Sequence, residues 1–293
     1  MYERSIDTDN GETARVAAAV VALLSRGRTG LVTDVDGTIS TIMARPEDAF
    51  VVPRARQALT GLRSYLALVA VITGRSVADA RQLVDVDGLT YIGNHGLEVW
   101  RDDHPETLPE ALPWVPRVTA VLAEVAASLD PVLRPGVLFE SKGATASLHY
   151  RLSPDPDRVR LELLGILTRT AEPRGLRVEE GRRVINLLPP LHVSKGSAVT
   201  WLVRDRALDG IVYLGDDVTD THAFRALDSL RASGTLRTLS IGVVGPETPP
   251  SIRELADLSV TSVNVVADLL CAVLEALEAG DTMNTTVPSV GSD

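Results

Sequence analysis

The chain has 293 residues, a length that suits one large domain or a core domain with an inserted one. Its formal net charge of −10 disfavours a nucleic-acid-binding surface, and its single cysteine excludes an intrachain disulfide. The polar, acidic N-terminus lacks a signal-peptide pattern, and no apolar run reaches the roughly 18 residues of a membrane span. We therefore expect a cytoplasmic protein without a nucleic-acid or membrane partner; the sequence does not indicate its oligomeric state.

Strands and helices alternate along most of the chain. Apolar runs predict strands at residues 29–35, 67–74, 90–94, 210–217 and 238–244. Helix-like patterns occupy residues 53–66 and 262–280. This alternation predicts an α/β fold with an open parallel sheet, in which ligands bind at the carboxyl ends of the strands.

The middle of the chain has a different pattern. Residues 113–129 and 155–175 predict helices, while residues 145–152 and 176–189 predict half-buried strands. We interpret the last range as a hairpin that turns at Glu180–Gly181. The sequence therefore predicts an α+β cap domain at 104–190, inserted into a core domain formed by 1–103 and 191–280, with a disordered tail at 281–293.

The stretch LVTDVDGTIS places Asp34 and Asp36 directly after a predicted buried strand. A carboxylate can attack phosphorus, and a second one can protonate the leaving oxygen and then activate water. Mg²⁺ would offset the repulsion between them, because it prefers oxygen ligands. Gly37 permits a tight turn, and Thr38 can offer its backbone and hydroxyl to phosphate. Taken alone, the motif favours the alternative interpretation, an ordinary acidic turn at the end of a strand.

Two further motifs fit phosphate binding. Thr73 ends a predicted strand and precedes Gly74 and Arg75, so its hydroxyl could hold a phosphate oxygen, although a helix cap would use the same residues. Lys195 follows Ser194 at a predicted helix start, which is a natural phosphate site. A solvated lysine is the alternative interpretation there.

Three carboxylates, Asp216, Asp217 and Asp220, follow another apolar strand. Carboxylates grouped at a strand end lower stability unless a cation is present. A loop of solvated charges is the alternative, but its position directly after an apolar strand favours the cation site.

In this order, D-x-D-G-T, T-G-R, K-G and G-D-D-x-x-D resemble the four motifs of the haloacid dehalogenase (HAD) superfamily phosphatases, over residues 31–280. The resemblance implies a Rossmann-like core, with Asp34 as the nucleophile and Asp36 as the general acid and base. It also implies that Thr73 and Lys195 hold the phosphoryl group.

The same resemblance implies a Mg²⁺ site. Its ligands would be Asp34, the backbone carbonyl of Asp36, and Asp216, with Asp217 and Asp220 in support.

Two other segments are similar to the trehalose-6-phosphate phosphatase family: YIGNHGLEVW to its G-N-H-G-x-E motif, and FESKGATASLHYR to its cap segment. Sugar hydroxyls need paired donors and acceptors. The resemblance implies a substrate face formed by Asn94, His95, Gly96 and Glu98 of the core and by Glu140, Lys142 and Arg151 of the cap. His149 remains open between a structural and a ligand-binding role.

The stretch EEGRRVINLLPP departs from this family's pattern, because Arg182 takes the place of a lysine and Asn186 that of a glutamate. We include both among the substrate-facing residues. The sequence therefore predicts a Mg²⁺-dependent phosphatase of trehalose 6-phosphate or a close analogue. A pseudo-disaccharide phosphate, such as validoxylamine A 7′-phosphate of aminocyclitol antibiotic biosynthesis, is an alternative substrate. A phosphosugar mutase and a non-catalytic sugar-phosphate sensor are alternative functions.

Overall fold

The structure, a computed structural model, describes residues 4–43, 45–234, 236–246 and 248–285. Its larger sheet has eight strands in the order β12-β11-β10-β1-β2-β3-β4-β5. Neighbours are parallel from β12 to β3, while β4 and β5 are antiparallel. The strands are β1 (Thr29–Thr33), β2 (Leu68–Ile72), β3 (Thr90–Gly93), β4 (Glu98–Arg101), β5 (His104–Thr107), β10 (Gly210–Gly215), β11 (Arg237–Val243) and β12 (Leu258–Val260).

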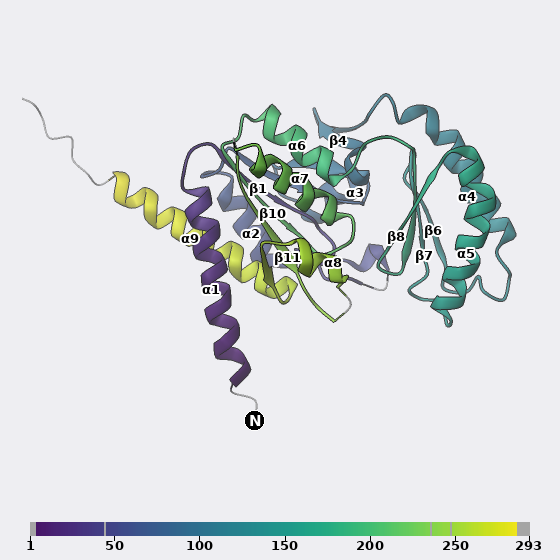
Figure 1. The fold of residues 1–293 in the computed structure, drawn as a ribbon, viewed down its shortest axis with the longest axis horizontal. Coiled ribbons are helices and arrows are strands. Elements are labelled where there is room, and N and C mark those ends of the chain that lie inside the picture. The colour runs from purple at the N-terminus through teal and green to yellow at the C-terminus, as the bar shows by residue number, and fades with distance from the viewer. Residues whose placement is uncertain (1–3, 44, 235, 247, 286–293) are drawn as a thin grey trace, which may run out of the picture.

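Helices cover both faces of this sheet (Figure 1). Because side chains alternate along a strand, Leu31 and Val212 pack into the apolar cluster of one face, and Val32 and Ile211 into that of the other. The first face packs against α1 (Arg4–Leu24), α2 (Pro53–Leu62), α3 (Val77–Val84) and α9 (Val263–Thr285). The second packs against α6 (Lys195–Asp205), α7 (Asp220–Ala232) and α8 (Pro250–Leu255).

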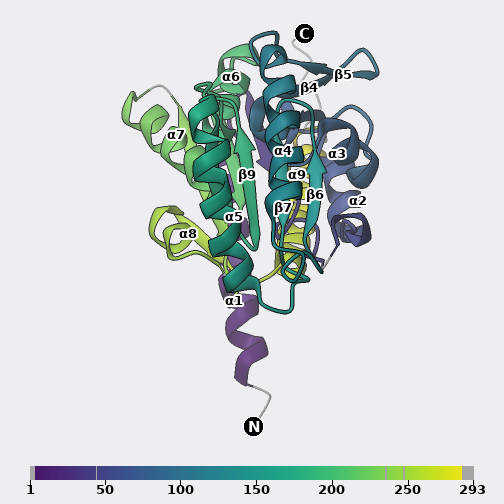
Figure 2. The ribbon, with the colours of Figure 1, turned by 90° about the vertical axis from the view of Figure 1, so that its right-hand side faces the viewer.

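A smaller antiparallel sheet stands beside the larger one, in the order β6-β7-β9-β8. Its strands are β6 (Leu138–Ser141), β7 (Ala146–His149), β8 (Arg177–Gly181) and β9 (Val184–Leu188). Two helices, α4 (Val115–Ser128) and α5 (Pro156–Thr170), cover its outer face (Figure 2). Leu148 and Ile185 pack beneath these helices. Ser147 and Asn186 point the other way, into a cavity shared with the larger sheet.

The predicted fold class is confirmed: a Rossmann-like core with a mostly parallel sheet, accompanied by an α+β unit. The boundaries predicted for the two domains remain predictions. The first of them, between residues 103 and 104, falls at the start of β5, which belongs to the larger sheet. Short 3₁₀ helices complete the structure: η1 (Pro46–Asp48), η2 (Asn94–Gly96), η3 (Leu112–Trp114) and η4 (Glu172–Arg174).

Two local expectations differ from the structure. The hairpin between β8 and β9 turns at Arg182 and Arg183 rather than at Glu180–Gly181, because Gly181 still pairs with Val184 and Arg183 adopts a positive φ of 60°. The C-terminal helix is longer than predicted: α9 continues through Thr285, past the predicted end at residue 280. Residues 286–293 of the predicted tail lie outside the described residues.

The polar N-terminal segment, for which the sequence predicts no element, forms α1, whose Val16 and Val20 are buried against the core. Over the part of the chain that the structure describes, no helix is both long and apolar enough to span a membrane. The cytoplasmic location remains a prediction.

Candidate active site

The carboxyl ends of neighbouring parallel strands bring the four motifs together. Asp34 follows β1, and its backbone N–H donates to the Leu214 carbonyl of β10 at 2.9 Å. Thr73 follows β2 and Asp216 follows β10, so both lie at the same edge of the sheet. Carboxylate oxygens of Asp34, Asp216 and Asp220 all lie within 4.8 Å of one another. The three buried acidic groups are therefore close enough to share one cation.

Lys195 is the buried cation of this cluster. It is the first residue of α6, which Ser194 and Ser197 begin with a reciprocal capping box. Its Nζ lies 2.9 Å from Oδ2 of Asp34 and 2.7 Å from Oδ1 of Asp220, and the side chain is 2% exposed. Burial on its own lowers the pKa of Lys195, but the two carboxylates outweigh it and raise that pKa above its ordinary value. Lys195 is therefore an ammonium ion that stabilises both negative charges.

Asp220 uses both of its oxygens inside the protein. Oδ1 accepts from Lys195 and from the Tyr213 hydroxyl, the latter at 2.6 Å. Oδ2 accepts from the backbone N–H groups of Asp216 and Asp217 at 3.1 and 3.0 Å. With these four hydrogen bonds, Asp220 fixes Lys195 and the turn after β10 in place.

Burial raises the pKa of Asp34 to about 7, with Lys195 opposing and the Asp220 and Asp36 carboxylates adding to the rise. Burial, together with Asp34 and Asp220, also raises the pKa of Asp216 well above its ordinary value. An ionised carboxylate pair in this environment favours a further positive charge. The cluster therefore has the chemistry of a divalent-cation site.

The surroundings of Asp216 fit a metal ion in detail. Thr38 donates its hydroxyl to Oδ1 of Asp216 at 3.2 Å. Gly37, at a φ of 81°, lies so close that a Cβ there would be 2.1 Å from Oδ2 of Asp216. Oδ1 of Asp217 is buried and lacks a hydrogen-bond partner among the described residues. Oxygen donors with unmet capacity are the ligand set that Mg²⁺ prefers.

Asp36 is held by Arg75. The guanidinium binds both carboxylate oxygens, at 2.7 and 2.8 Å, and donates to the Pro46 carbonyl at 3.0 Å. The backbone N–H of Arg75 donates to the Thr73 hydroxyl at 3.2 Å. The sequence assigns Arg75 to the substrate, and the structure adds that it positions the predicted acid and base at the cavity wall.

One cavity joins the larger sheet to the smaller one. Of the residues predicted for the site, the cavity is lined by Asp34, Asp36, Thr73, Gly74, Arg75, His95, Glu140, Lys142, Arg151, Arg182, Asn186, Lys195, Asp216 and Asp217. The remaining predicted residues are not among those that line it: Gly37, Thr38, Asn94, Gly96, Glu98 and Asp220. His95 lines the cavity, and burial lowers its pKa well below the ordinary value, with Lys142 and Lys195 adding to the effect.

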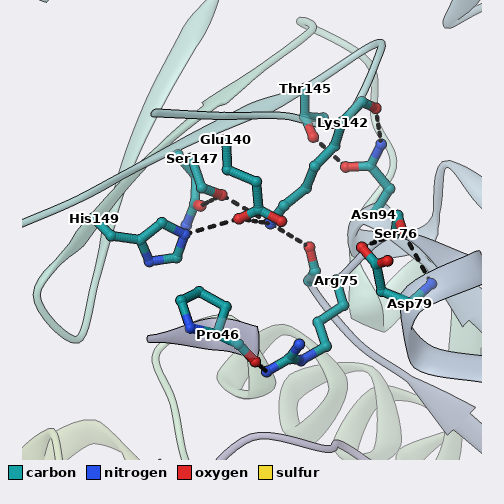
Figure 3. A network of polar contacts seen from close by, with 12 residues as sticks. Pro46, Arg75, Ser76, Asp79, Asn94, Glu140, Lys142, Thr145, Ser147 and His149 are labelled. Atoms are coloured by element: carbon teal, nitrogen blue, oxygen red, sulfur yellow. Dashed lines mark hydrogen bonds and ion pairs between the residues drawn. The ribbon is translucent and has the colours of Figure 1, made fainter. Parts of the chain in front are cut away.

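The cap side of the cavity carries a polar network that includes Glu140 of β6 and Ser147 and His149 of β7 (Figure 3). Oε2 of Glu140 lies 2.8 Å from Nε2 of His149 and 3.4 Å from Nζ of Lys142. Lys142 also donates to the Ser147 hydroxyl at 2.8 Å, and Ser147 donates to Oδ1 of Asn186 at 2.8 Å. These contacts form a continuous row of donors and acceptors along the wall.

Ser147 is not among the residues that the sequence predicts for the site, and the role of His149 stays open there. Both lie on β7 and line the cavity, two residues apart. The signal that would have found them is the alternation along this strand, since Ala146 and Leu148 point into the cap core.

Arg182 reaches from the cap hairpin to the acidic cluster. Its Nη2 lies 3.1 Å from Oδ2 of Asp216, 3.2 Å from the Asp216 carbonyl and 3.3 Å from the Thr248 hydroxyl. Arg151, a second cap arginine, donates to the Arg182 carbonyl at 3.0 Å. The tip of the hairpin is therefore joined to a buried carboxylate of this cluster.

Comparison with known proteins identifies the family to which the chain belongs. The sequence profile of trehalose-phosphatases matches residues 32–248. A trehalose-phosphate phosphatase of Mycobacterium tuberculosis is 36% identical over 200 residues, which are 65% of this chain and 49% of that protein. An uncharacterized glycosyl hydrolase of the same species is 33% identical over 287 residues, 92% of this chain and 20% of that protein. The chain thus spans about a fifth to about half the length of these relatives.

The chain therefore belongs to the trehalose-phosphatase family, and the predicted place in the HAD superfamily is confirmed with it. The C-terminal domain of Candida albicans trehalose-6-phosphate phosphatase has the same fold, with a TM-score of 0.74 at 20% identity over 88% of this chain and 96% of that one. A trehalose-6-phosphate phosphatase related protein superposes with a TM-score of 0.69 at 20% identity, over 87% of this chain and 99% of that one. The family is one of phosphatases, which supports the predicted enzyme class.

A pH-dependent contribution to stability is expected from Glu140. Burial raises its pKa, but the hydrogen bond from His149 and the charge of Lys142 outweigh burial and lower the pKa from 4.5 to about 2. A carboxylate with a lowered folded-state pKa contributes stability above its unfolded pKa and loses it as the pH falls towards the folded one. We expect Glu140→Gln to lower the free energy of unfolding most at pH 6–7, and progressively less from about pH 4.5 downwards.

Urea unfolding at pH 6.5 and pH 3.5 measures this difference. Glu162→Gln, in the cap helix α5, serves as the control because it is outside the network. A loss of stability for Glu140→Gln that is equal at the two pH values would show that the network does not hold Glu140 in its ionised form.

Proposed function

We propose that this chain is a Mg²⁺-dependent phosphatase that hydrolyses a disaccharide phosphate, trehalose 6-phosphate or a close analogue, through an aspartyl-phosphate on Asp34. The observation that carries the proposal is the convergence of Asp34 with Lys195 and Asp216 at the floor of a cavity that Asp36 lines. The family match supports the reaction class, and the cap wall supports a substrate with several hydroxyl groups.

In the first half-reaction, a carboxylate oxygen of Asp34 forms a bond to phosphorus while the bond from phosphorus to the sugar oxygen breaks. Asp36 donates its proton to that leaving oxygen. In the second half-reaction, the Asp36 carboxylate takes a proton from water, whose oxygen attacks phosphorus. Inorganic phosphate leaves, and Asp34 returns to its carboxylate form. Lys195 and the Thr73 hydroxyl hold phosphoryl oxygens during both steps.

The residues that would hold Mg²⁺ are Asp34, Asp216 and the backbone carbonyl of Asp36, with Asp217 and Asp220 in support. When bound, the ion offsets the negative charge of the phosphoryl group and of the carboxylates. The hydrogen bonds of Asp220 to Lys195, to Tyr213 and to the turn after β10 would keep these ligands in register.

Selection of the sugar is assigned to the cap. Glu140, Lys142 and Asn186 line the cavity on the face opposite Asp34, and closure of the cap would exclude water while the aspartyl-phosphate exists. Asn186 offers an amide where the family's pattern has a carboxylate, so it lacks the charge and adds a donor. A charged acceptor bond is worth about 1.5–3 kcal/mol. This difference points to a substrate related to, but distinguishable from, trehalose 6-phosphate.

The two catalytic carboxylates give the first test of the proposal. Asp34→Asn should abolish turnover, because an amide is not an effective nucleophile, while leaving the fold intact. Asp36→Asn should lower kcat about 10²–10⁴-fold, because it removes the proton carrier. Phosphate release is measured over trehalose 6-phosphate, sucrose 6-phosphate, glucose 6-phosphate and aminocyclitol phosphates, with EDTA as a further control. Turnover by Asp34→Asn, or undiminished turnover in EDTA, would contradict the mechanism, and isomerised sugar phosphate without free phosphate would indicate a mutase.

Arg182 gives a test of the cation site. Its guanidinium lies 3.1 Å from Oδ2 of Asp216, one of the residues that would hold Mg²⁺. Removing it should therefore tighten Mg²⁺ binding, and we expect Arg182→Ala to lower the Kd about tenfold, the effect of one charged hydrogen bond. Arg183→Ala is the matched control, because the neighbouring Arg183 pairs with Asp157 at 2.8 Å instead. Isothermal titration with Mg²⁺ measures both, and equal Kd values for the two variants would remove Asp216 from the proposed ligand set.

Asn186 and Glu140 test the assignment of specificity. We expect Asn186→Glu to raise kcat/KM for trehalose 6-phosphate about tenfold or more, without changing hydrolysis of a small aryl phosphate. Glu140→Ala should have the reverse effect on disaccharide phosphates and spare the aryl phosphate. Steady-state kinetics measures kcat/KM of each variant for trehalose 6-phosphate and for the aryl phosphate. Equal changes on both types, for both variants, would make these cap residues structural.

A further inference from the structure

Asn94 contacts the turn between β6 and β7 (Figure 3). It is not among the residues that line the cavity. It is fully buried in η2, directly after β3. Its Nδ2 donates to the Lys142 carbonyl at 2.9 Å and to Oε1 of Glu98 at 3.1 Å, and its Oδ1 accepts from the Thr145 hydroxyl. Both amide hydrogens are therefore used within the protein, and no donor remains for a sugar hydroxyl.

The cap half of this contact is the turn between β6 and β7. Lys142 and Thr145 are its two ends, and the Lys142 N–H donates to the Thr145 carbonyl at 2.9 Å. Thr145 is 2% exposed and lies outside the cavity. Between them, Ala144 packs with Leu97 and Ala111 in a small apolar cluster. The turn is thus held on the core by polar and apolar contacts together.

The core half of the contact is anchored on a helix. Oε2 of Glu98 accepts from the backbone N–H of Val77, the first residue of α3, at 2.9 Å. A carboxylate at a helix N-terminus is stabilised by the unpaired N–H groups and the helix dipole there. The backbone N–H of Asn94 donates to the Arg75 carbonyl at 2.6 Å. Asn94 is therefore fixed both to α3 and to the loop that follows β2.

The position of this turn decides where Lys142 lies. Nζ of Lys142 donates to the Gly74 carbonyl at 2.9 Å, between Thr73 and Arg75, and lies 3.4 Å from Oε2 of Glu140. A shift of the turn would move Lys142 off Gly74 and displace the row of polar groups along the cap wall. The contact therefore sets the distance between the sugar-facing wall and the phosphate-facing loop.

We propose that Asn94 and Thr145 form a core–cap clamp that positions Lys142 over the loop of residues 73–75, with Glu98 orienting Asn94. In this assignment Asn94 and Glu98 are positioning residues and do not touch the sugar, in contrast to the role implied by the sequence resemblance. The kinetic consequence rests on the proposed function, whereas the clamp itself can be measured without a substrate.

The substrate-free test is amide hydrogen exchange in Thr145→Val, which removes the hydroxyl and keeps the branched shape. We expect the amides of residues 142–146 to exchange several-fold faster, and Thr145→Ser to restore the native rate. Ser141→Ala is the matched control, because Ser141 is exposed on the same hairpin. Exchange in Thr145→Val that equals that of Ser141→Ala would overturn the clamp, whatever the substrate of the protein is.

A double-mutant cycle separates a clamp from a sugar ligand. If Asn94 acts through Thr145, then Asn94→Ala combined with Thr145→Val should raise KM for the disaccharide phosphate no further than Asn94→Ala alone. Thr145→Val should raise this KM and leave kcat for a small aryl phosphate unchanged. If the two substitutions raise KM independently, so that their effects multiply, Asn94 contacts the sugar and the clamp is wrong. A Thr145→Val variant with native KM would lead to the same conclusion. Far-ultraviolet circular dichroism of each variant verifies that it is folded.

Discussion

The arrangement of the site depends on one buried ion cluster, in which the ammonium of Lys195 lies between Asp34 and Asp220. Each of these side chains is at most 6% exposed. An isolated buried charge is costly, and a buried pair is tolerated only when it is close and fully hydrogen-bonded. Lys195 satisfies this condition because the capping box at Ser194 begins α6 directly beside the carboxyl ends of β1 and β10. Loss of Lys195 would leave two carboxylates without their cation.

The cluster nevertheless lacks positive charge: when ionised, the carboxylates of Asp34, Asp216 and Asp220 carry three negative charges, and Lys195 supplies one positive charge. Asp34 and Asp216 both have raised pKa values, chiefly because they are buried. Arg182 of the cap supplies a guanidinium to Asp216 from the far side of the cavity. The charge deficit thus accounts both for the affinity proposed for Mg²⁺ and for the contact between the cap hairpin and the core. The Asp216 carboxylate therefore belongs both to the proposed Mg²⁺ site and to the contact that holds the cap hairpin.

The sequence predicts best where local pattern and chemistry coincide. Asp34, Thr73 and Asp216 follow strands that apolar runs indicate, and Lys195 begins a helix that a serine cap indicates. The family resemblance supplied their proposed roles.

Contacts between segments that are distant in the sequence could not be predicted from local sequence pattern. The pairing of Arg75 with Asp36 and the burial of Asn94 against Thr145 depend on loops that meet only after folding. The turn at Arg182 and Arg183 also escaped prediction, because local glycine preference points to Gly181, whereas register in the sheet keeps Gly181 paired.

Equilibrium unfolding with and without Mg²⁺ tests the central claim most directly, since it needs no knowledge of the substrate. A cation that binds the folded carboxylate cluster should raise the free energy of unfolding by about 2.7 kcal/mol at a concentration 100 times its Kd. We predict this stabilisation for the native chain and its loss in Asp216→Asn. Equal Mg²⁺-dependent stabilisation of both proteins, or none in the native chain, would contradict the account.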